Sequence, residues 1–205
     1  YQLYLATSPP PITAADCLDE VPEPAKWLEL DWDPALPVHY IEWCEVDAFC
    51  AANAKRLCGK IGGGPLDGSD ESVIDAAQSE WFNACSAAGT RSYPYGDGYE
   101  ADRCAPGTIE GVQALEPPGS RPECEGGFPG LFDMNGNVTE HENGCRYFPP
   151  TPGKTEWEHR YLCAHRGRLT ESASTGCSYT RSESTSSDSA RGIRCCADVI
   201  EKNAP

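Results

Sequence analysis

The sequence has no apolar stretch long enough to cross a bilayer, and it is poor in positive charge. No run approaches the roughly 18 consecutive apolar residues that a membrane-spanning helix needs. Lysine and arginine number 16 against 32 aspartates and glutamates, so the formal net charge of the 205 residues is −16 at pH 7. Because such an acidic surface repels phosphate groups, the composition argues against nucleic-acid binding and against docking on anionic lipids. No membrane span and no coiled coil are expected.

The chain also lacks any Cys-x-x-Cys pair, the usual sign of a structural zinc site. Its twelve cysteines are even in number and widely spread, which favours up to six disulfides formed in an oxidising compartment. A reduced, metal-binding set is the alternative. The adjacent pair Cys195-Cys196 is a poor candidate to close on itself, because a disulfide needs a particular separation of its Cα atoms. The spacing leaves the connectivity open. The cysteines are Cys17, Cys44, Cys50, Cys58, Cys85, Cys104, Cys124, Cys145, Cys163, Cys177, Cys195 and Cys196.

Internal repeats are absent as well, and the length suits one domain spanning 1–205, with a tail at 199–205. Glycine (20) and proline (18) together make up about one residue in five, which indicates a folded but loop-rich chain. No signal peptide is visible and the first residue is not methionine. For a secreted protein, this start is interpreted as the result of processing or trimming.

Two helices are predicted from apolar spacing. The first covers roughly 43–56, and the second covers about 75–87, where Asp75 is expected to cap the start and Gln78 to complete a capping box. The glycine run at 62–64 is predicted to be a flexible turn, because no Lys-Ser/Thr follows it as a phosphate loop requires. Residues 170–189 contain 12 serines and threonines, and are expected to form a long segment anchored at both ends.

Seven segments carry a recognisable pattern, and in chain order they run from Pro37 to Cys44, Ala54 to Cys58, Gln78 to Trp81, Tyr93 to Asp97, Gly130 to Glu140, His165 to Gly167 and Gly192 to Cys195. Together they resemble the formylglycine-generating enzyme family, also called the sulfatase-modifying-factor domain, in its secreted, cysteine-rich bacterial type. The resemblance covers roughly 1–198 and implies an α+β variant of the C-type lectin fold, with two helices, short strands, long loops and disulfide staples. Family members carry a further strand before the region that matches Tyr1–Leu5, so this chain is expected to lack the family's first strand.

The resemblance implies a calcium site, because hard cations prefer carboxylate and carbonyl oxygens held in a turning loop. By position, its ligands would be Asp133, Gly136, Val138 and Glu140, with the glycine and the valine contributing backbone carbonyls. The alternative is a capped turn in which Glu140 forms a salt bridge. A weaker second calcium set would comprise Asp102, Arg103, Glu110 and Val112.

Active members of the family oxidise a substrate cysteine to formylglycine, using two cysteines five positions apart that bind copper(I). The corresponding positions here are Ser172 and Cys177. Since a serine hydroxyl is a hard donor that cannot replace a thiolate, bound copper is not expected. Cys177 is predicted to close a disulfide, with a free reactive thiol as the alternative. The four histidines (His39, His141, His159 and His165) form no iron-binding set, and His141 is predicted to lie in a solvent-facing turn.

These observations favour a non-catalytic extracellular domain for binding or assembly, secreted or on the cell surface, with its ligand or partner face around 168–190. Within that segment Tyr179, Arg181 and Glu183 alternate, so in an extended chain they would share one side and could contact a protein or a glycan outside the cell, or a second copy. A solvated loop without a ligand is the simpler interpretation. The alternatives are a copper-dependent formylglycine-generating oxidase, which needs a free Cys177, and a structural subunit of a secreted or cell-surface assembly that exchanges a strand near the start of the chain.

Overall fold

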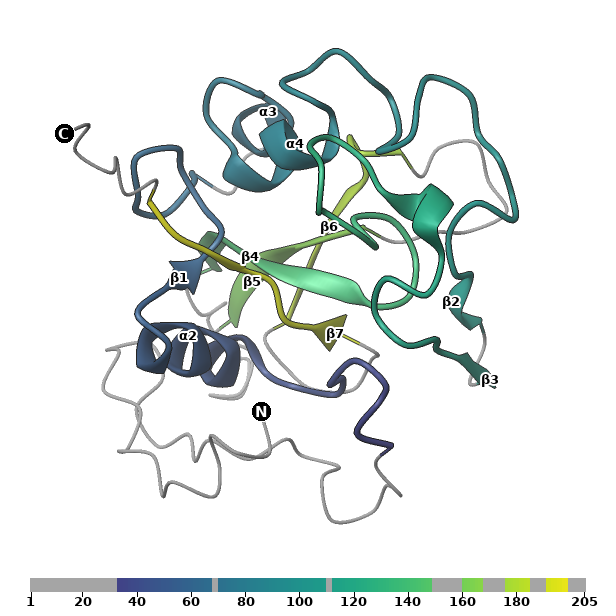
Figure 1. Cartoon of the computed structure of the whole chain (residues 1–205). Coiled ribbons are helices and arrows are strands. Elements are labelled where there is room, and N and C mark those ends of the chain that lie inside the picture. Colours follow the sequence, from purple (N-terminus) through teal and green to yellow (C-terminus); the bar gives the residue numbers. More distant parts are fainter. Residues whose placement is uncertain are drawn as a thin grey trace, which may run out of the picture.

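The chain folds into a mixed α+β structure with few helices and short strands (Figure 1). The computed structural model describes residues 33–67, 70–109, 112–148, 160–167, 176–184 and 191–198. A four-stranded sheet lies at the centre, and the helices and long loops are arranged around it (Figure 1).

The central sheet has the strand order β6-β5-β4-β7. The first three strands, β6 (Thr180–Ser184), β5 (Arg160–Arg166) and β4 (Thr139–Phe148), are antiparallel, and β7 (Arg191–Gly192) runs parallel to β4. The β4–β5 register changes between His141 and Cys145, where β4 is irregular.

Two smaller sheets have two strands each. In the first, β1 (Arg56–Leu57) pairs with β8 (Cys195–Cys196), and in the second, β2 (Gly107–Ile109) pairs with β3 (Val112–Ala114). The β1–β8 pair brings together two segments that are far apart in the sequence.

Helix α2 (Trp43–Ala52) begins where predicted but ends four residues earlier than expected. Its start is a capping box formed by Glu42 and Glu45, in which the Glu42 N–H donates to the Glu45 carboxylate at 2.8 Å. Its end is set by Asn53, whose N–H bonds to the Cys50 carbonyl, and by Ala54, which has a left-handed φ of 53°. A left-handed residue cannot continue a right-handed helix.

The second predicted helix is much shorter than expected, because α4 covers only Glu80–Cys85. Asp75 caps a separate turn, where it accepts the Ala77 N–H at 2.8 Å, and Ser79 is the true N-cap, accepting the Phe82 N–H at 3.0 Å. A one-turn helix, α3 (Asp70–Val73), and a 3-10 helix (Pro122–Cys124) are the other helical elements among the described residues. No helix in the described ranges has the length and apolarity of a membrane span.

The expected disulfide stapling is confirmed. Cys195 and Cys196 bond to different partners, and so attach β8 both to the end of α2 and to the segment just after β1. Cys44 is also disulfide-bonded, none of the eleven cysteines in the described residues is free, and Cys17 lies outside those residues. The disulfides that join two described cysteines are Cys50–Cys195, Cys58–Cys196, Cys85–Cys177, Cys104–Cys124 and Cys145–Cys163.

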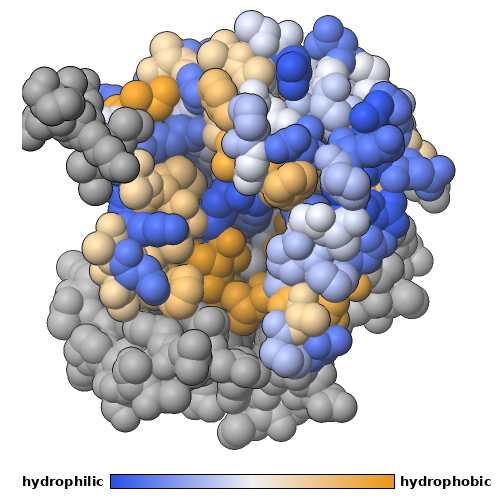
Figure 2. Space-filling model, viewed as in Figure 1, coloured by the Kyte–Doolittle hydropathy of each residue, from blue (hydrophilic) through white to orange (hydrophobic). Residues whose placement is uncertain are grey.

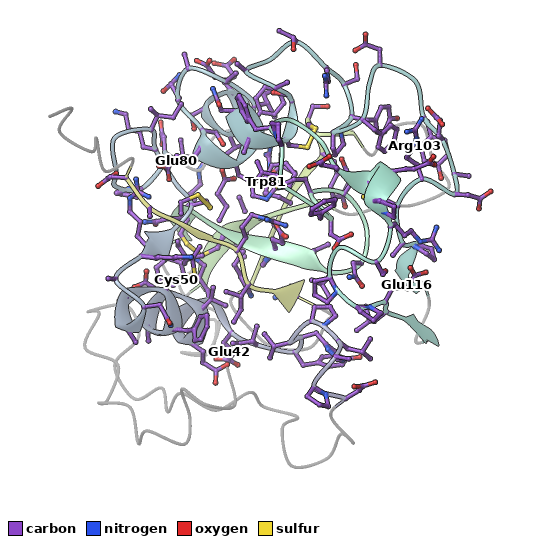
Figure 3. All side chains as sticks on the ribbon, viewed as in Figure 1. Glu42, Cys50, Glu80, Trp81, Arg103 and Glu116 are labelled. Atoms are coloured by element: carbon purple, nitrogen blue, oxygen red, sulfur yellow. A yellow bond between two sulfur atoms is a disulfide. The ribbon has the colours of Figure 1, made fainter. Side chains whose placement is uncertain are left out.

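The core consists of small clusters in which sulfur atoms take a large share. One cluster joins Trp81 and Met134 to three half-cystines, and a second contains Ile41, Val46 and Leu57. Figure 3 shows Trp81 near the middle of the molecule, between α4 and the sheet. The glycine run at 62–64 forms a turn as predicted, with a left-handed φ at all three positions.

Candidate functional site

Cys177, at the position of the second catalytic cysteine of the resembled family, is fully buried and forms a disulfide with Cys85 of α4. Its backbone N–H donates to the Ser92 carbonyl at 2.8 Å. The other position, Ser172, lies outside the described residues. Cys177 therefore has no free thiolate with which to bind copper(I).

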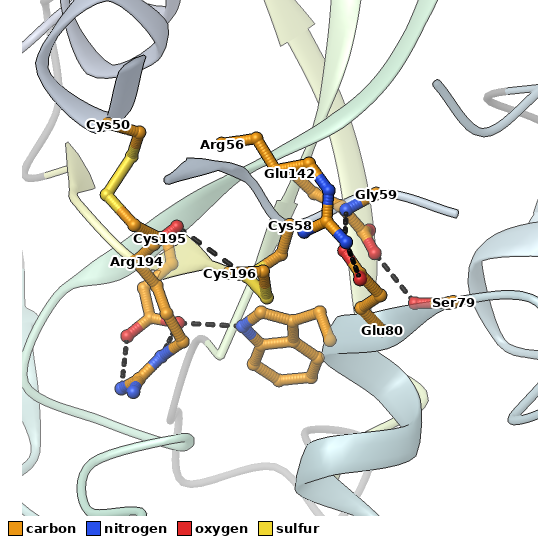
Figure 4. Close-up of a disulfide and its surroundings, with 12 residues drawn as sticks. Cys50, Arg56, Cys58, Gly59, Ser79, Glu80, Glu142, Arg194, Cys195 and Cys196 are labelled. Carbon is orange, nitrogen blue, oxygen red and sulfur yellow. Dashed lines mark hydrogen bonds and ion pairs between the residues drawn. A yellow bond between two sulfur atoms is a disulfide. The ribbon is translucent and has the colours of Figure 1, made fainter. Parts of the chain in front are cut away.

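A buried ion pair adjoins this disulfide. Arg166 of β5 and Glu142 of β4 are both 0% exposed, and 3.7 Å separates the Arg166 Nε from the Glu142 Oε2. Ser79 donates to the other Glu142 oxygen at 2.7 Å (Figure 4). The Arg166 guanidinium lies 4.7 Å from the centre of the Trp81 ring and donates to the Cys177 carbonyl at 2.9 Å.

The burial of these charges shifts their pKa values. Loss of hydration raises the pKa of Glu142 to about 7, although the nearby Arg166 charge opposes the shift. Loss of hydration also lowers the pKa of Arg166. The pair links β4 to β5 beside the Cys85–Cys177 disulfide.

The prediction that His141 faces solvent is wrong. The side chain is fully buried in β4, and its Nε2 lies 2.9 Å from the Ile41 carbonyl oxygen. Because a carbonyl can only accept, Nε2 carries the proton, and burial lowers the pKa of His141 to about 3. The flanking glutamates gave the segment an exposed pattern, but Glu140 and Glu142 are themselves buried with partners.

The loop before β4 contains three residues with a left-handed backbone conformation, Asp133, Gly136 and Asn137. Gly136 is required, because a Cβ there would lie 2.1 Å from the Ala105 carbonyl oxygen. The Asn137 amide pairs with the Glu116 backbone, accepting its N–H at 3.1 Å and donating to its carbonyl at 2.9 Å. The loop therefore has a fixed shape.

Glu140, at the end of this loop, forms a two-pronged ion pair with Arg194 (Figure 4). The Arg194 Nη2 and Nε each lie 2.7 Å from a carboxylate oxygen, and the Trp81 Nε1 donates to Oε2 at 2.7 Å. Arg194 also donates to the Phe132 carbonyl at 2.9 Å. This is the salt-bridged arrangement considered above as the alternative to calcium.

The calcium site stays a prediction. As placed, Glu140 does not fit a calcium ligand, because both of its oxygens are engaged and Arg194 already neutralises it. One Asp133 oxygen accepts the Gly119 N–H at 2.7 Å, and Gly136 and Val138 lie in the loop between the two acids. Within the described ranges, no group of three or more His, Cys, Asp or Glu side chains is placed to hold a metal ion.

The residues of the weaker calcium set have other contacts or lie outside the described part. Arg103 donates twice to the Glu100 carboxylate, each time at 3.1 Å, and the Asp102 carbonyl accepts from Arg121 at 2.7 Å. Val112 begins β3, and Glu110 lies outside the described residues.

The predicted ligand face includes β6. Arg181 lies opposite His165 and Glu183 opposite Cys163 in the β5–β6 register, so these alternate positions share a face of the sheet. Tyr179 is half-buried and directly precedes the strand. The expected alternation is thus present in the backbone from Thr180 to Ser184.

A cluster of tyrosines that the sequence did not reveal lies beside the turn before β6. The rings of Tyr93 and Tyr95 stack at 5.6 Å, Tyr99 lies 5.9 Å from Tyr93, and the Arg103 guanidinium lies over Tyr95 at 5.3 Å. Gly176 packs so closely on this segment that a Cβ there would be 2.3 Å from the Ser92 carbonyl oxygen. The spacing Tyr-Pro-Tyr-Gly-Asp-Gly-Tyr could have indicated the cluster.

A second feature is an open cleft of about 750 Å³ between the 33–38 segment, α2 and the loop from 118 to 133. Figure 2 shows a hollow in this face, bordered by hydrophobic residues. Its apolar walls include Leu36, Val38, Phe49, Phe132 and Ile193. Asp133, Glu140 and Arg194 provide charged groups in its lining.

Comparisons with known proteins give little guidance. No protein-family model matches the sequence, and no curated protein matches it. Among solved structures, the crystal structure of CarF is similar to this chain at a TM-score of 0.46 and 16% sequence identity, covering 78% of this chain and 67% of that one. A likeness this distant establishes neither a family nor a function.

Proposed function

We propose that the chain is a non-catalytic extracellular domain for binding or assembly, built on a C-type-lectin-like scaffold of the formylglycine-generating enzyme kind. The observation that carries the proposal is the burial of Cys177 in a disulfide with Cys85. An oxidase of this kind needs that sulfur as a thiolate. The disulfides also favour an oxidising location such as the cell exterior.

The proposed ligand face is the 168–190 segment, with a protein or a glycan as partner. Its described part, 176–184, adjoins the tyrosine cluster through the hydrogen bond from Cys177 to Ser92. Tyrosine and arginine side chains are enriched at recognition surfaces, since they combine a large apolar area with polar tips. Tyr179, Arg181 and the tyrosine cluster supply both residue types.

Alkylation under denaturing conditions without prior reduction is expected to add no mass to the chain. After reduction, all twelve cysteines should react, and intact mass spectrometry would count them. An unreduced sample in which Cys177 is alkylated would contradict the proposal. Copper(I) titration would then test the oxidase alternative.

The binding face can be tested on a printed glycan array and a displayed peptide library. For any glycan or peptide that the parent chain binds, we expect Arg181→Ala to weaken the affinity at least tenfold, because an arginine at an interface centre often carries a large share of the affinity. Arg146→Ala, at an exposed β4 position outside the 168–190 segment, is the matched control and should bind like the parent chain. Absence of binding on both platforms, or equal loss in the two variants, would argue against the proposed face.

A further inference from the structure

We propose that the open cleft beside α2 is a second binding site, which takes an extended, neutral or basic peptide with apolar side chains. It is separate from the described part of the proposed 168–190 face, because neither Cys177 nor any residue of β6 lines it. The proposal therefore does not depend on the function proposed above.

The size and walls of the cleft suit such a ligand. A volume of about 750 Å³ lies within the ~300–1,000 Å³ range typical of binding sites. The apolar side chains of the lining include Leu36, Val38, Phe49 of α2, Phe132 and Ile193. These apolar side chains border a space open to solvent, where they can bury the side chains of a ligand.

The lining also holds a hydrogen-bond donor and an acceptor that have no partner in the described part of the chain. Arg194 uses Nε and Nη2 for Glu140 and Phe132, which leaves the two N–H groups of Nη1 without a partner, and the side chain is 23% exposed. Asp133 uses Oδ2 for Gly119 and leaves Oδ1 without one. Because Arg194 bonds to the carbonyl of Phe132, the residue before Asp133, the donor and the acceptor lie close together. This pattern matches the carbonyl and N–H groups of a peptide backbone.

The donor is held rigidly. The Glu140 carboxylate holds one edge of the Arg194 guanidinium through both Nε and Nη2, and the disulfides at Cys195 and Cys196 fix the backbone just after Arg194. A preorganised donor loses little conformational entropy on binding, so more of each hydrogen bond contributes to affinity.

The charge of the lining favours neutral or basic peptides over acidic ones. Three carboxylates, Asp33, Asp133 and Glu140, face two cations, Lys55 and Arg194, so the lining has one net negative charge. The whole chain has a net charge of −16, which repels acidic peptides at longer range.

Two capped tetrapeptides test the site in EDTA-containing buffer, acetyl-Leu-Phe-Lys-Leu-amide and its counterpart with glutamate in place of lysine. We expect saturable binding of the lysine peptide, at least fivefold weaker binding of the glutamate peptide, and NMR shift changes in the backbone amides of Val38, Ile193 and Arg194.

Leu36→Trp, which places a larger side chain in the cleft, should weaken binding of the lysine peptide at least tenfold. Ile61→Trp, at a position that is 44% exposed and does not line the cleft, should leave it unchanged.

Asp133→Asn provides a second variant that keeps an oxygen acceptor and tolerates the left-handed backbone. It should reduce the preference for lysine over glutamate, because one carboxylate charge is lost. The proposal is overturned if neither peptide binds saturably, or if Leu36→Trp binds as well as Ile61→Trp. Arg181→Ala should not alter this binding, so failure here and failure of the 168–190 face give different results.

Discussion

Replacing Glu142 with leucine is expected to destabilise the fold by about 3–5 kcal/mol, because the change leaves a buried arginine without its counter-charge. Arg166 and Glu142 are fully buried, and burial raises the pKa of Glu142 to about 7 while lowering that of Arg166. Both shifts come chiefly from lost hydration, which the opposite charge of the partner offsets only in part. The free energy of unfolding, measured by urea denaturation at pH 8, would give the loss directly.

A double-mutant cycle separates the ion pair from the packing. Combining Glu142→Leu with Arg166→Met should recover about half of the loss, since an apolar pair of similar volume avoids the buried charge. Recovery should be incomplete, because Ser79 and the Cys177 carbonyl would each lose a partner. Glu100→Gln, in the exposed pair with Arg103, is the control and should cost less than about 1 kcal/mol. A loss for Glu142→Leu no larger than for this control would contradict the interpretation.

Much of the scaffold could be predicted from the sequence. The disulfides and the abundance of loops follow from the cysteine count and the glycine and proline content, and the start of α2 follows from apolar spacing. The helix ends did not follow, because they depend on local competition. Ser79 took the capping role expected of Asp75, and Ala54 adopted a left-handed conformation that nothing in its residue type indicates.

The buried charges and the cleft depend on tertiary contacts that one sequence cannot reveal. Glu142 has partners at the N-cap of α4 and in β5, and Glu140 has partners in Trp81 and Arg194, which are 59 and 54 positions away. In the sequence, this run of acids and a histidine had the pattern of an exposed turn. The cleft likewise combines residues from several segments, among them Leu36, Phe132 and Ile193.

The buried imidazole of His141 predicts a loss of stability in acid. Its pKa is lowered from 6.5 to about 3, so the unfolded chain binds a proton between these values while the folded chain does not. The free energy of unfolding therefore has no penalty from His141 above pH 6.5. Below that pH it falls by about 1.4 kcal/mol for each pH unit, until the pH reaches about 3. Glu142 acts in the opposite direction, because its raised pKa makes stability fall as the pH increases from 4.5 to about 7. The two effects should nearly cancel between pH 4.5 and 6.5.

His141→Gln is expected to remove the effect of the histidine and expose that of Glu142. A glutamine amide can still donate toward the Ile41 carbonyl but does not titrate. The variant should be less stable than the parent at pH 7. That difference should shrink by about 1.4 kcal/mol per unit as the pH falls from 6.5 toward 3, measured by urea unfolding at several pH values. Carboxylates elsewhere titrate in both proteins and cancel in the comparison. A difference between the two proteins that does not change with pH would mean that His141 titrates alike in the folded and unfolded chain, which its complete burial against Ile41 and His165 argues against.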